Sequence, residues 1–266
     1  MLEAERHRLI LKLLQERSII SIADLMETIG ASDATTRRDV NSLAEAGRLH
    51  RIRGGAEALN PRHLSHLVGM PFAISRETAV PQKRAIARAA AELIVDGDSL
   101  IINAGTSTLA LVEFIAHRQL DILTNSIPIL TRLHGSGSNR VSIPGGRVFR
   151  EQNIIISPFE DHTVDSFWAS KLFTGCFGIN EHGLMEADPL VVQAQARLLR
   201  RADQVIVLAD SRKLRQRSAI IIAPLERVSI LVTDDSAREE DLEAVRQANV
   251  RVIIAVTEPV TAQSIA

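Results

Sequence analysis

The chain has 266 residues, of which 45% are hydrophobic, 24% charged and 3% aromatic, and its 31 Lys and Arg residues nearly balance 32 Asp and Glu residues. This composition is typical of a globular protein of one or two domains and disfavours a disordered chain. No apolar run approaches the roughly 18 residues that a membrane-spanning helix needs, and the charged N-terminus lacks the apolar core of a signal peptide. We therefore expect a cytoplasmic protein.

The single cysteine, Cys176, allows neither an internal disulfide nor a multi-cysteine metal site, and we predict no metal and no cofactor. The net charge of −1 gives no general argument for a nucleic-acid partner, because DNA-binding domains are usually basic overall. A DNA-binding prediction must therefore depend on where the charges lie along the chain.

The first 60 residues carry three helical patterns separated by tight turns. Apolar residues recur at helical spacing over 4–17, 22–29 and 33–46. Ser21 and Ser32 are typical N-cap residues for the second and third of these helices. This pattern predicts a helix, a second helix, a tight turn and a third helix.

Threonine and arginine side chains gather at the start of the third predicted helix. Such a helix can present them to DNA base edges, because arginine pairs with guanine and threonine offers a hydroxyl and a methyl group. Residues 48–59 then carry three arginines around Gly54–Gly55, which favours a two-stranded basic wing with a hairpin turn. The alternative is that these arginines are only solvated charges. The predicted DNA contacts are Ser32, Thr35, Thr36, Arg37, Arg38, Arg48, Arg51, Arg53 and Gly54.

The remainder of the chain has a different pattern. Residues 60–81 carry three prolines and no clear period, which predicts a linker. Helical and strand patterns alternate over 82–266, which predicts βαβ units around a mostly parallel sheet. We therefore expect an α/β protein with a DNA-binding domain at 1–59, a linker at 60–81 and a second domain at 82–266.

The strand-to-helix loop at 103–108, Asn-Ala-Gly-Thr-Ser-Thr, has the chemistry of an anion site. Its glycine allows close backbone approach, its hydroxyls are donors, and the following helix directs its positive N-terminal end toward the same point. A plain helix-capping turn is the alternative. Polar residues also follow two other predicted strands, at 124–126 and 210–213, and ligands bind where such strand ends meet.

These motifs, taken together, resemble the deoxyribose-operon repressor (DeoR) family over nearly the whole chain. The resemblance rests on Ser32-x-x-Thr35-x-Arg37-Arg38-Asp39, followed in order by 47–49, 51–56, 83–87, 103–108, 123–126, 145–146 and 208–213. It implies a winged helix-turn-helix followed by a sensor domain similar in fold to ribose-5-phosphate isomerase and the CoA transferases.

The resemblance also implies a function. Members of the family are transcriptional regulators, most often repressors of a carbohydrate operon, and a phosphorylated sugar or sugar acid releases them from operator DNA. We expect a homo-oligomer, dimer or tetramer, because paired heads read repeated half-sites. The predicted effector-binding residues are Lys83, Asn103, Gly105, Thr106, Ser107, Thr108, Thr124, Asn125, Ser126, Gly145, Gly146, Asp210 and Lys213.

The sequence departs from the common family pattern at several positions. Asn103 stands where an aspartate is usual, and a lysine usual in a later helix is missing, with Arg197 the nearest cation. Together with the segments 156–160 and 184–189, these departures resemble the branch that contains the L-ascorbate-utilisation repressor. Within the second segment, Glu186 and Asp188 are candidates for contact with sugar hydroxyls or are simply solvated.

An isomerase acting on a sugar phosphate, with a fused helical domain, is the competing interpretation. Isomerisation needs a positioned carboxylate or a similar base. The run 174–179 is neutral where the related isomerases carry an acid-rich strand end, and Asn103 removes another candidate base. We therefore favour a regulator over an enzyme.

Overall fold

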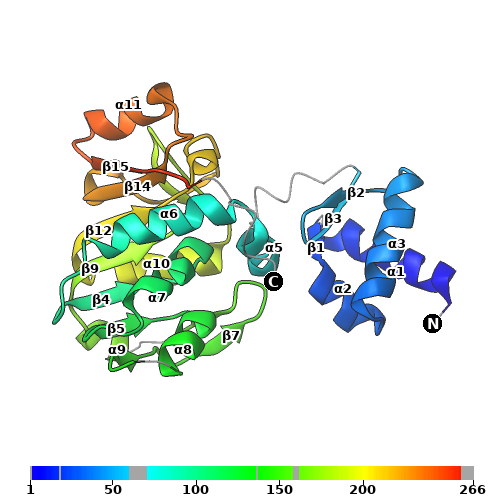
Figure 1. Cartoon of the computed structure of the whole chain (residues 1–266), viewed down its shortest axis with the longest axis horizontal. Helices are drawn as coiled ribbons and strands as arrows, with labels where there is room; N and C mark the ends of the chain where they lie inside the picture. Colours follow the sequence, from blue (N-terminus) through cyan, green and yellow to red (C-terminus); the bar gives the residue numbers. More distant parts are fainter. Residues whose placement is uncertain (1, 18, 60–70, 136, 158–161, 259–266) are drawn as a thin grey trace. The chain divides into compact units, whose positions relative to one another are not determined.

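The computed structural model describes residues 2–17, 19–59, 71–135, 137–157 and 162–258 (Figure 1). The chain divides into two compact units, Met1–Thr78 and Ala79–Ala266. Residues 60–70, which belong to the predicted linker, lie outside the described residues, and the predicted domain boundaries stay predictions. No helix among the described residues is long and apolar enough to cross a membrane.

The first unit is a helical bundle with a small sheet. Its elements are α1 (Glu3–Arg17), β1 (Ile19–Ser21), α2 (Ile22–Ile29), α3 (Asp33–Glu45), β2 (Leu49–Ile52), β3 (Gly55–Ala58) and α5 (Phe72–Glu77). Both predicted caps form, because the Ser21 and Ser32 side chains accept hydrogen bonds from backbone amides in the first turns of α2 and α3. Apolar side chains of α1, α2, α3 and the strands share one core, which includes Ile10, Leu25 and Val40.

The wing differs in detail from the sequence expectation. Strands β2 and β3 pair with Ile52 opposite Gly55, so the two turn residues are Arg53 and Gly54, not Gly54 and Gly55. Gly54 supplies the positive φ of +79° that this turn requires. Gly55 lies in β3 for a different reason. A Cβ at Gly55 would approach the carbonyl oxygen of Ile20 to 2.4 Å, because β1 pairs closely with β3 to form a third strand that the sequence did not predict.

The second unit is built on a parallel sheet of seven strands in the order β15-β14-β12-β9-β4-β5-β6. The strands of this sheet are β4 (Ser99–Ile102), β5 (Asp121–Thr124), β6 (Arg140–Ser142), β9 (Ala169–Thr174), β12 (Ala202–Leu208), β14 (Ile230–Asp234) and β15 (Arg251–Ala255). The other elements are α6 (Val80–Ala91), α7 (Thr106–Ile115), α8 (Ile127–His134), α9 (His162–Ser166), α10 (Pro189–Leu199) and α11 (Glu239–Gln247), with two short 3₁₀ turns, Ser211–Leu214 and Leu225–Arg227.

Helices cover both faces of this sheet. Successive strand residues point to opposite faces, so Ile102 packs into the core shared with α6, α7 and α8, while Ile101 packs into the core shared with α9, α10 and α11. Burial on both faces explains the nearly continuous apolar strands in the sequence. The predicted α/β class with an N-terminal winged helix-turn-helix and a C-terminal α/β domain is confirmed.

Two small antiparallel sheets were not expected. One contains β10 (Gly178–Asn180), β11 (Gly183–Glu186) and β13 (Ile220–Ala223), and the other contains β7 (Arg147–Phe149) and β8 (Ile154–Ile156). The apolar run 172–179 therefore does not form one strand. It ends as β9 at Thr174 and resumes as β10 at Gly178, which leaves residues 175–177 as a loop at the carboxyl end of β9.

Candidate DNA-binding surface and candidate effector site

The first turn of α3 is held in place by its own hydroxyl groups. Ser32 Oγ accepts a hydrogen bond from the Thr35 amide at 3.3 Å and lies 2.9 Å from Thr35 Oγ1. Thr36 is fully buried, and its hydroxyl donates to the Ser32 carbonyl at 3.0 Å. The Thr36 side chain therefore anchors the start of the helix, and its predicted contact with DNA stays a prediction.

The two arginines of α3 are in different situations. The Arg37 side chain is half exposed and donates to Asp33 at 2.8 Å one turn earlier, and this hydrogen bond raises the pKa of Arg37. Exposed pairs of this kind contribute only about 0.2–1 kcal/mol, so a phosphate can replace Asp33. The Arg38 side chain is exposed and forms no hydrogen bond or ion pair with any described residue.

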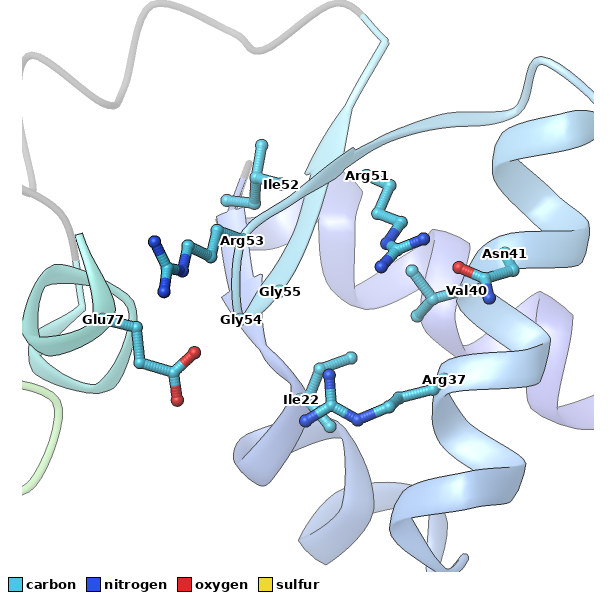
Figure 2. A pocket seen from close by; sticks show the side chains of 10 residues that line it. All are labelled: Ile22, Arg37, Val40, Asn41, Arg51, Ile52, Arg53, Gly54, Gly55 and Glu77. Atoms are coloured by element: carbon cyan, nitrogen blue, oxygen red, sulfur yellow. The ribbon is translucent and has the colours of Figure 1, made fainter. Parts of the chain in front are cut away.

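Helix α3 and the wing formed by β2 and β3 together make a concave, basic surface. The side chains of Arg48, Arg51 and Arg53 are exposed and make no hydrogen bond or ion pair within the described part of the chain. A cavity of about 450 Å³ lies between α3 and the wing, and Figure 2 shows the residues that line it: Ile22, Arg37, Val40, Asn41, Arg51, Ile52, Arg53, Gly54, Gly55 and Glu77. Arginine side chains around such a hollow can donate hydrogen bonds to the phosphates of a DNA backbone.

Asp39 is a structural residue that sequence reasoning missed. This carboxylate is 2% exposed on the inner face of α3 and accepts two hydrogen bonds from Arg6 of α1, at 2.6 and 3.0 Å. The Arg6 hydrogen bonds hold the pKa of Asp39 below its usual value. The available signal was its position, because Asp39 lies on the same helix face as the apolar Val40 and Leu43. The pair fixes the recognition helix to α1.

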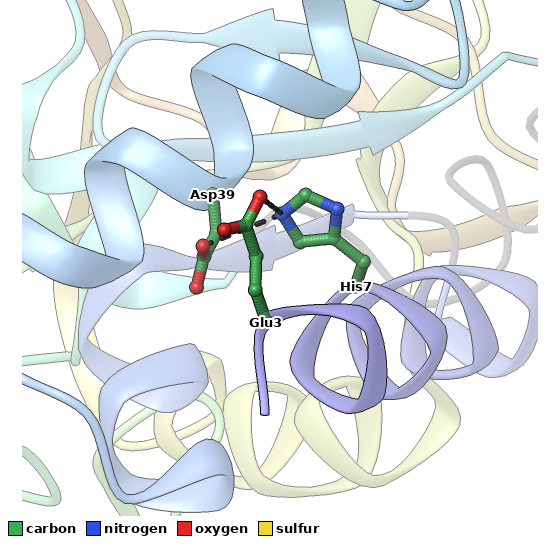
Figure 3. Close-up of side chains that lie close together, drawn as sticks. All are labelled: Glu3, His7 and Asp39. Carbon is green, nitrogen blue, oxygen red and sulfur yellow. Dashed lines mark ion pairs between the residues drawn. The ribbon is translucent and has the colours of Figure 1, made fainter. Parts of the chain in front are cut away.

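Glu3 and His7 of α1 approach the same aspartate (Figure 3). His7 Nε2 lies 3.3 Å from an Asp39 oxygen and 3.8 Å from a Glu3 oxygen, and the three potential ligand atoms lie within 4.8 Å of one another. Both Asp39 oxygens already accept from Arg6, so a cation there would have to displace a guanidinium group. We therefore interpret the group as a structural ion-pair network.

In the second unit, the loop after β4 is fixed by neighbouring strand ends. The Asn103 side-chain amide donates to Thr174 Oγ1 at 2.9 Å, and the Ala104 backbone amide donates to Asn125 Oδ1 at 2.9 Å. Gly105 is the N-cap of α7, and the Thr108 hydroxyl donates to its carbonyl at 3.0 Å. The first-turn amides of α7, at residues 106–108, have no carbonyl one turn earlier in the helix to bind, which is the usual basis of an anion site.

Thr124 and Ser126 play a supporting part. Both are buried, and Thr124 Oγ1 donates to the Ile102 carbonyl at 2.6 Å and accepts from the Ser126 amide at 3.1 Å. Ser126 Oγ accepts from the Ile129 amide as the cap of α8. The hydrogen bonds of these two hydroxyls are directed inward, and their predicted contact with an effector stays a prediction. They shape the end of β5 and so hold Asn125 against the loop after β4.

Gly145 and Gly146 lie in the connection between β6 and β7. A Cβ at Gly146 would approach the Ile156 carbonyl oxygen to 2.3 Å, so this glycine allows close packing on β8. The adjacent Ile155 amide donates to the Asn125 carbonyl at 2.8 Å. The described contacts therefore connect Gly146 to the end of β5 through the backbone, while Gly145 has open space beside its Cα.

Cations gather at the carboxyl end of β12. Lys83 of α6 is only 4% exposed, and burial lowers its pKa to about 8; Asp210 opposes this shift, while Lys213 and Arg212 add to it. Lys213 Nζ donates to Gln216 Oε1 at 2.9 Å and lies 5.4 Å above the Phe177 ring. The cluster is therefore positively charged and partly withdrawn from water.

Asp210 is already neutralised within this cluster. Its two oxygens accept from Arg212 at 2.7 and 3.0 Å. Burial alone would raise the pKa of Asp210, but Arg212, Lys213 and Lys83 together lower it below its usual value. Arg212 was quoted in the sequence motif but not chosen as a site residue. Its role depends on a contact with Asp210, two residues earlier, and neither the helical nor the strand period of the sequence predicts that contact.

The loop 175–177 and its neighbours complete the same region. Gln195 of α10 is 1% exposed and donates to Thr174 Oγ1 at 2.7 Å and to the Gly175 carbonyl at 3.0 Å. Burial raises the pKa of Glu186 and raises that of Cys176 to about 12, and Lys213 opposes both shifts. Arg197 binds Asp165 at 3.0 Å. Gln195 thus reaches the strand ends near which the family's missing lysine was sought.

Comparison with known proteins agrees with both parts of the chain. A family model described as "DeoR-like helix-turn-helix domain" matches residues 6–62, and one described as "DeoR C terminal sensor domain" matches residues 78–235. The chain is 29% identical over 254 residues to the HTH-type transcriptional regulator UlaR of Shigella dysenteriae serotype 1 (strain Sd197), covering 95% of this chain and 99% of that protein.

Solved structures with a similar arrangement are more distant. Ribose 5 phosphate isomerase A from Neisseria gonorrhoeae is 12% identical, with a TM-score of 0.35, over 49% of this chain and 52% of that one. A probable sor operon regulator from Shigella flexneri is 14% identical, with a TM-score of 0.40, over 65% of this chain and 89% of that one. At this level of similarity neither structure carries an argument about function.

Proposed function

This chain belongs to the DeoR family of DNA-binding transcriptional regulators, and from that premise we propose how its own residues hold an operator and an effector. It is a repressor of a sugar operon and not an enzyme. We propose that a small anionic carbohydrate, a sugar phosphate or a sugar acid, binds at the strand ends of the second unit and lowers the affinity of the first unit for operator DNA.

For the operator, we propose that α3 enters the major groove and that the wing holds the DNA backbone. Arg38 and Thr35 lie on the outer side of the first turns of α3, from which base edges can be reached. Arg48, Arg51 and Arg53 provide cations for phosphates, and the Gly54 backbone allows close approach at the wing tip. Ser32 caps the helix end that faces the same backbone.

For the effector, the partly buried positive cluster is the observation that carries the proposal. Lys83, Lys213 and Arg212 surround one ionised carboxylate, Asp210, so the region retains positive charge that an anion would neutralise. The first-turn amides of α7 at residues 106–108 provide further donors. Asn103 and Asn125 offer neutral amides, of which Asn103 replaces the more common aspartate and changes the preference among sugars.

We propose that the effector acts by a population shift in a symmetric oligomer. Such a ligand changes operator affinity only through its different affinity for two arrangements of the DNA-binding heads. Paired heads would match repeated half-sites in one arrangement and miss them in the other. Sedimentation equilibrium of the full chain would give the subunit number, and a monomer at the concentrations that bind operator would contradict this part.

A thermal-shift screen of sugar phosphates and sugar acids tests the effector proposal. A ligand present at 100 times its dissociation constant stabilises the protein by about 2.7 kcal/mol. Lys213→Ala should lose most of that shift and keep operator binding. Arg140→Ala is the matched control, because Arg140 is exposed on the edge strand β6. Equal shifts in the wild type and Lys213→Ala would contradict the assigned site.

A further inference from the structure

The short helix α5 lies against the wing of the first unit. Its apolar residues Phe72 and Ile74 are buried. Ile74 packs beside the wing strand β3, because a Cβ at Gly55 would meet Ile74 Cδ1 at 3.0 Å. The Thr78 hydroxyl donates to the Ile74 carbonyl at 2.8 Å and closes the end of the helix. These contacts fix the position of Glu77, which lies between Ile74 and Thr78 in the sequence.

Glu77 places a carboxylate over the tip of the wing. A Cβ added at Gly54 would lie 2.5 Å from Glu77 Oε2, so the carboxylate occupies the space directly beside this turn. Figure 2 shows Glu77 extending from α5 toward the turn, on the same hollow that Arg37, Arg51 and Arg53 line. The Glu77 charge also acts on Arg37 across the hollow. The hydrogen bond to Asp33 is the main cause that raises the pKa of Arg37, and the negative charge of Glu77 adds to it.

We infer that Glu77 is an internal competitor for a DNA phosphate in the hollow between the recognition helix and the wing. A carboxylate and a phosphate diester each carry one negative charge and are attracted by the same arginine side chains. With Glu77 in place, its carboxylate lies directly beside Gly54, and its negative charge repels a phosphate that approaches the hollow. DNA that contacts the wing must therefore displace Glu77 together with α5.

This inference goes beyond the proposed function, because it assigns an autoinhibitory contact to the head itself and needs no effector. It also gives α5 a reason to carry an acid at its last position, next to a surface otherwise suited to an anion. The hollow between α3 and the wing is closed when α5 is docked and open when α5 has moved away.

Binding of the full chain to a 20-base-pair duplex of random sequence tests the inference. Glu77→Gln should bind about threefold more tightly at about 0.1 M salt, and the difference should disappear at high salt. Glu45→Gln is the matched control, because it removes the same charge from an exposed position of α3 that does not line the hollow. Equal gains in Glu77→Gln and Glu45→Gln would overturn the inference, since bulk charge would then explain both.

A second variant separates position from charge. Glu77→Asp keeps the charge but shortens the side chain by one methylene, so its carboxylate withdraws from Gly54. We expect this variant also to bind the random duplex more tightly than the wild type, although less so than Glu77→Gln. An affinity equal to that of the wild type would overturn the claim that the carboxylate acts by occupying the hollow.

Discussion

The cations of the two units are held in opposite ways. In the first unit, Arg38, Arg48, Arg51 and Arg53 are exposed and have no partner within the described part of the chain. In the second unit, Lys83 is buried beside Lys213 and Arg212, and its pKa falls to about 8. Exposed arginines suit a large polyanion whose binding is weakened by salt. A buried lysine suits a small anion that can enter the site, because the anion stabilises the charged amine in place of the water that it has lost.

The largest expected effect concerns the ion pair between Arg6 and Asp39 in the first unit. Asp39→Ala removes the carboxylate that accepts both Arg6 hydrogen bonds, and breaking a buried pair costs about 3–5 kcal/mol, less here because Arg6 is partly exposed. We expect urea denaturation of the variant to show a loss of about 2–4 kcal/mol. Asp33→Ala, at an exposed pair on the same helix, is the control and should lose less than about 1 kcal/mol.

The same pair gives the first unit its acid sensitivity. The pKa of Asp39 is lowered in the folded protein, so its contribution to stability is complete above the ordinary aspartate value of 3.8 and is lost as the pH falls through the folded-state pKa. Between pH 5 and pH 3 the stability difference between wild type and Asp39→Ala should therefore shrink. A constant difference over this range would show that the Arg6 contact does not depend on the Asp39 charge.

Lys83→Met should remove the effector response and at the same time stabilise the protein without ligand. Because the pKa of Lys83 is lowered, the charged amine opposes folding at pH 7, and its replacement by an apolar side chain should add about 2 kcal/mol. Thermal unfolding at pH 7 checks this. A destabilised Lys83→Met would contradict this prediction, because the contacts of the amine would then outweigh the cost of burying its charge.

The stability of the wild type should also rise with pH in a defined window. Between about pH 8 and the ordinary lysine value of 10.5, the folded protein binds fewer protons than the unfolded chain, so folding becomes more favourable. Lys83→Met should lack this component. Effector binding should change in the opposite direction, because above about pH 8 an anion can bind only with uptake of a proton, and its affinity should fall by up to about tenfold per pH unit.

Arg38→Ala should cost about 1–3 kcal/mol of operator binding and relax the preference for operator over random DNA. Arg53→Ala, on the wing, should instead weaken both by a similar factor and reduce the salt slope by about one. Fluorescence anisotropy with the two duplexes over a series of salt concentrations distinguishes these results. If both variants lower only the random-DNA affinity, α3 does not read bases.

Local chemistry explains what the sequence could predict. The caps Ser21 and Ser32 follow from the preference of serine for the residue before a helix. The parallel core strands follow from continuous apolar runs, because these strands are buried on both faces. The strand-end loop at 103–108 was also located correctly as the start of α7. These features depend on a few consecutive residues, so one sequence is enough to identify them.

Features that depend on contacts between distant residues were missed. The Arg6–Asp39 pair joins residues 33 positions apart. The antiparallel sheet of β10, β11 and β13 joins separate segments, and no pattern in the sequence indicates that they pair. Thr36, Thr124 and Ser126 are buried, and the sequence alone could not assign their roles, because a hydroxyl can bind the backbone as readily as a ligand. Only the three-dimensional contacts show which choice each hydroxyl makes.

The central claim is that the exposed arginines bind DNA while the partly buried lysine cluster senses an anion and controls that binding. It is tested most directly by titrating an effector from the thermal-shift screen into a complex of the full chain with the intergenic DNA beside its own gene. We predict that the wild type is released and that Lys213→Ala binds the DNA equally well but stays bound at the same effector concentration. Equal release of both proteins would contradict the claim.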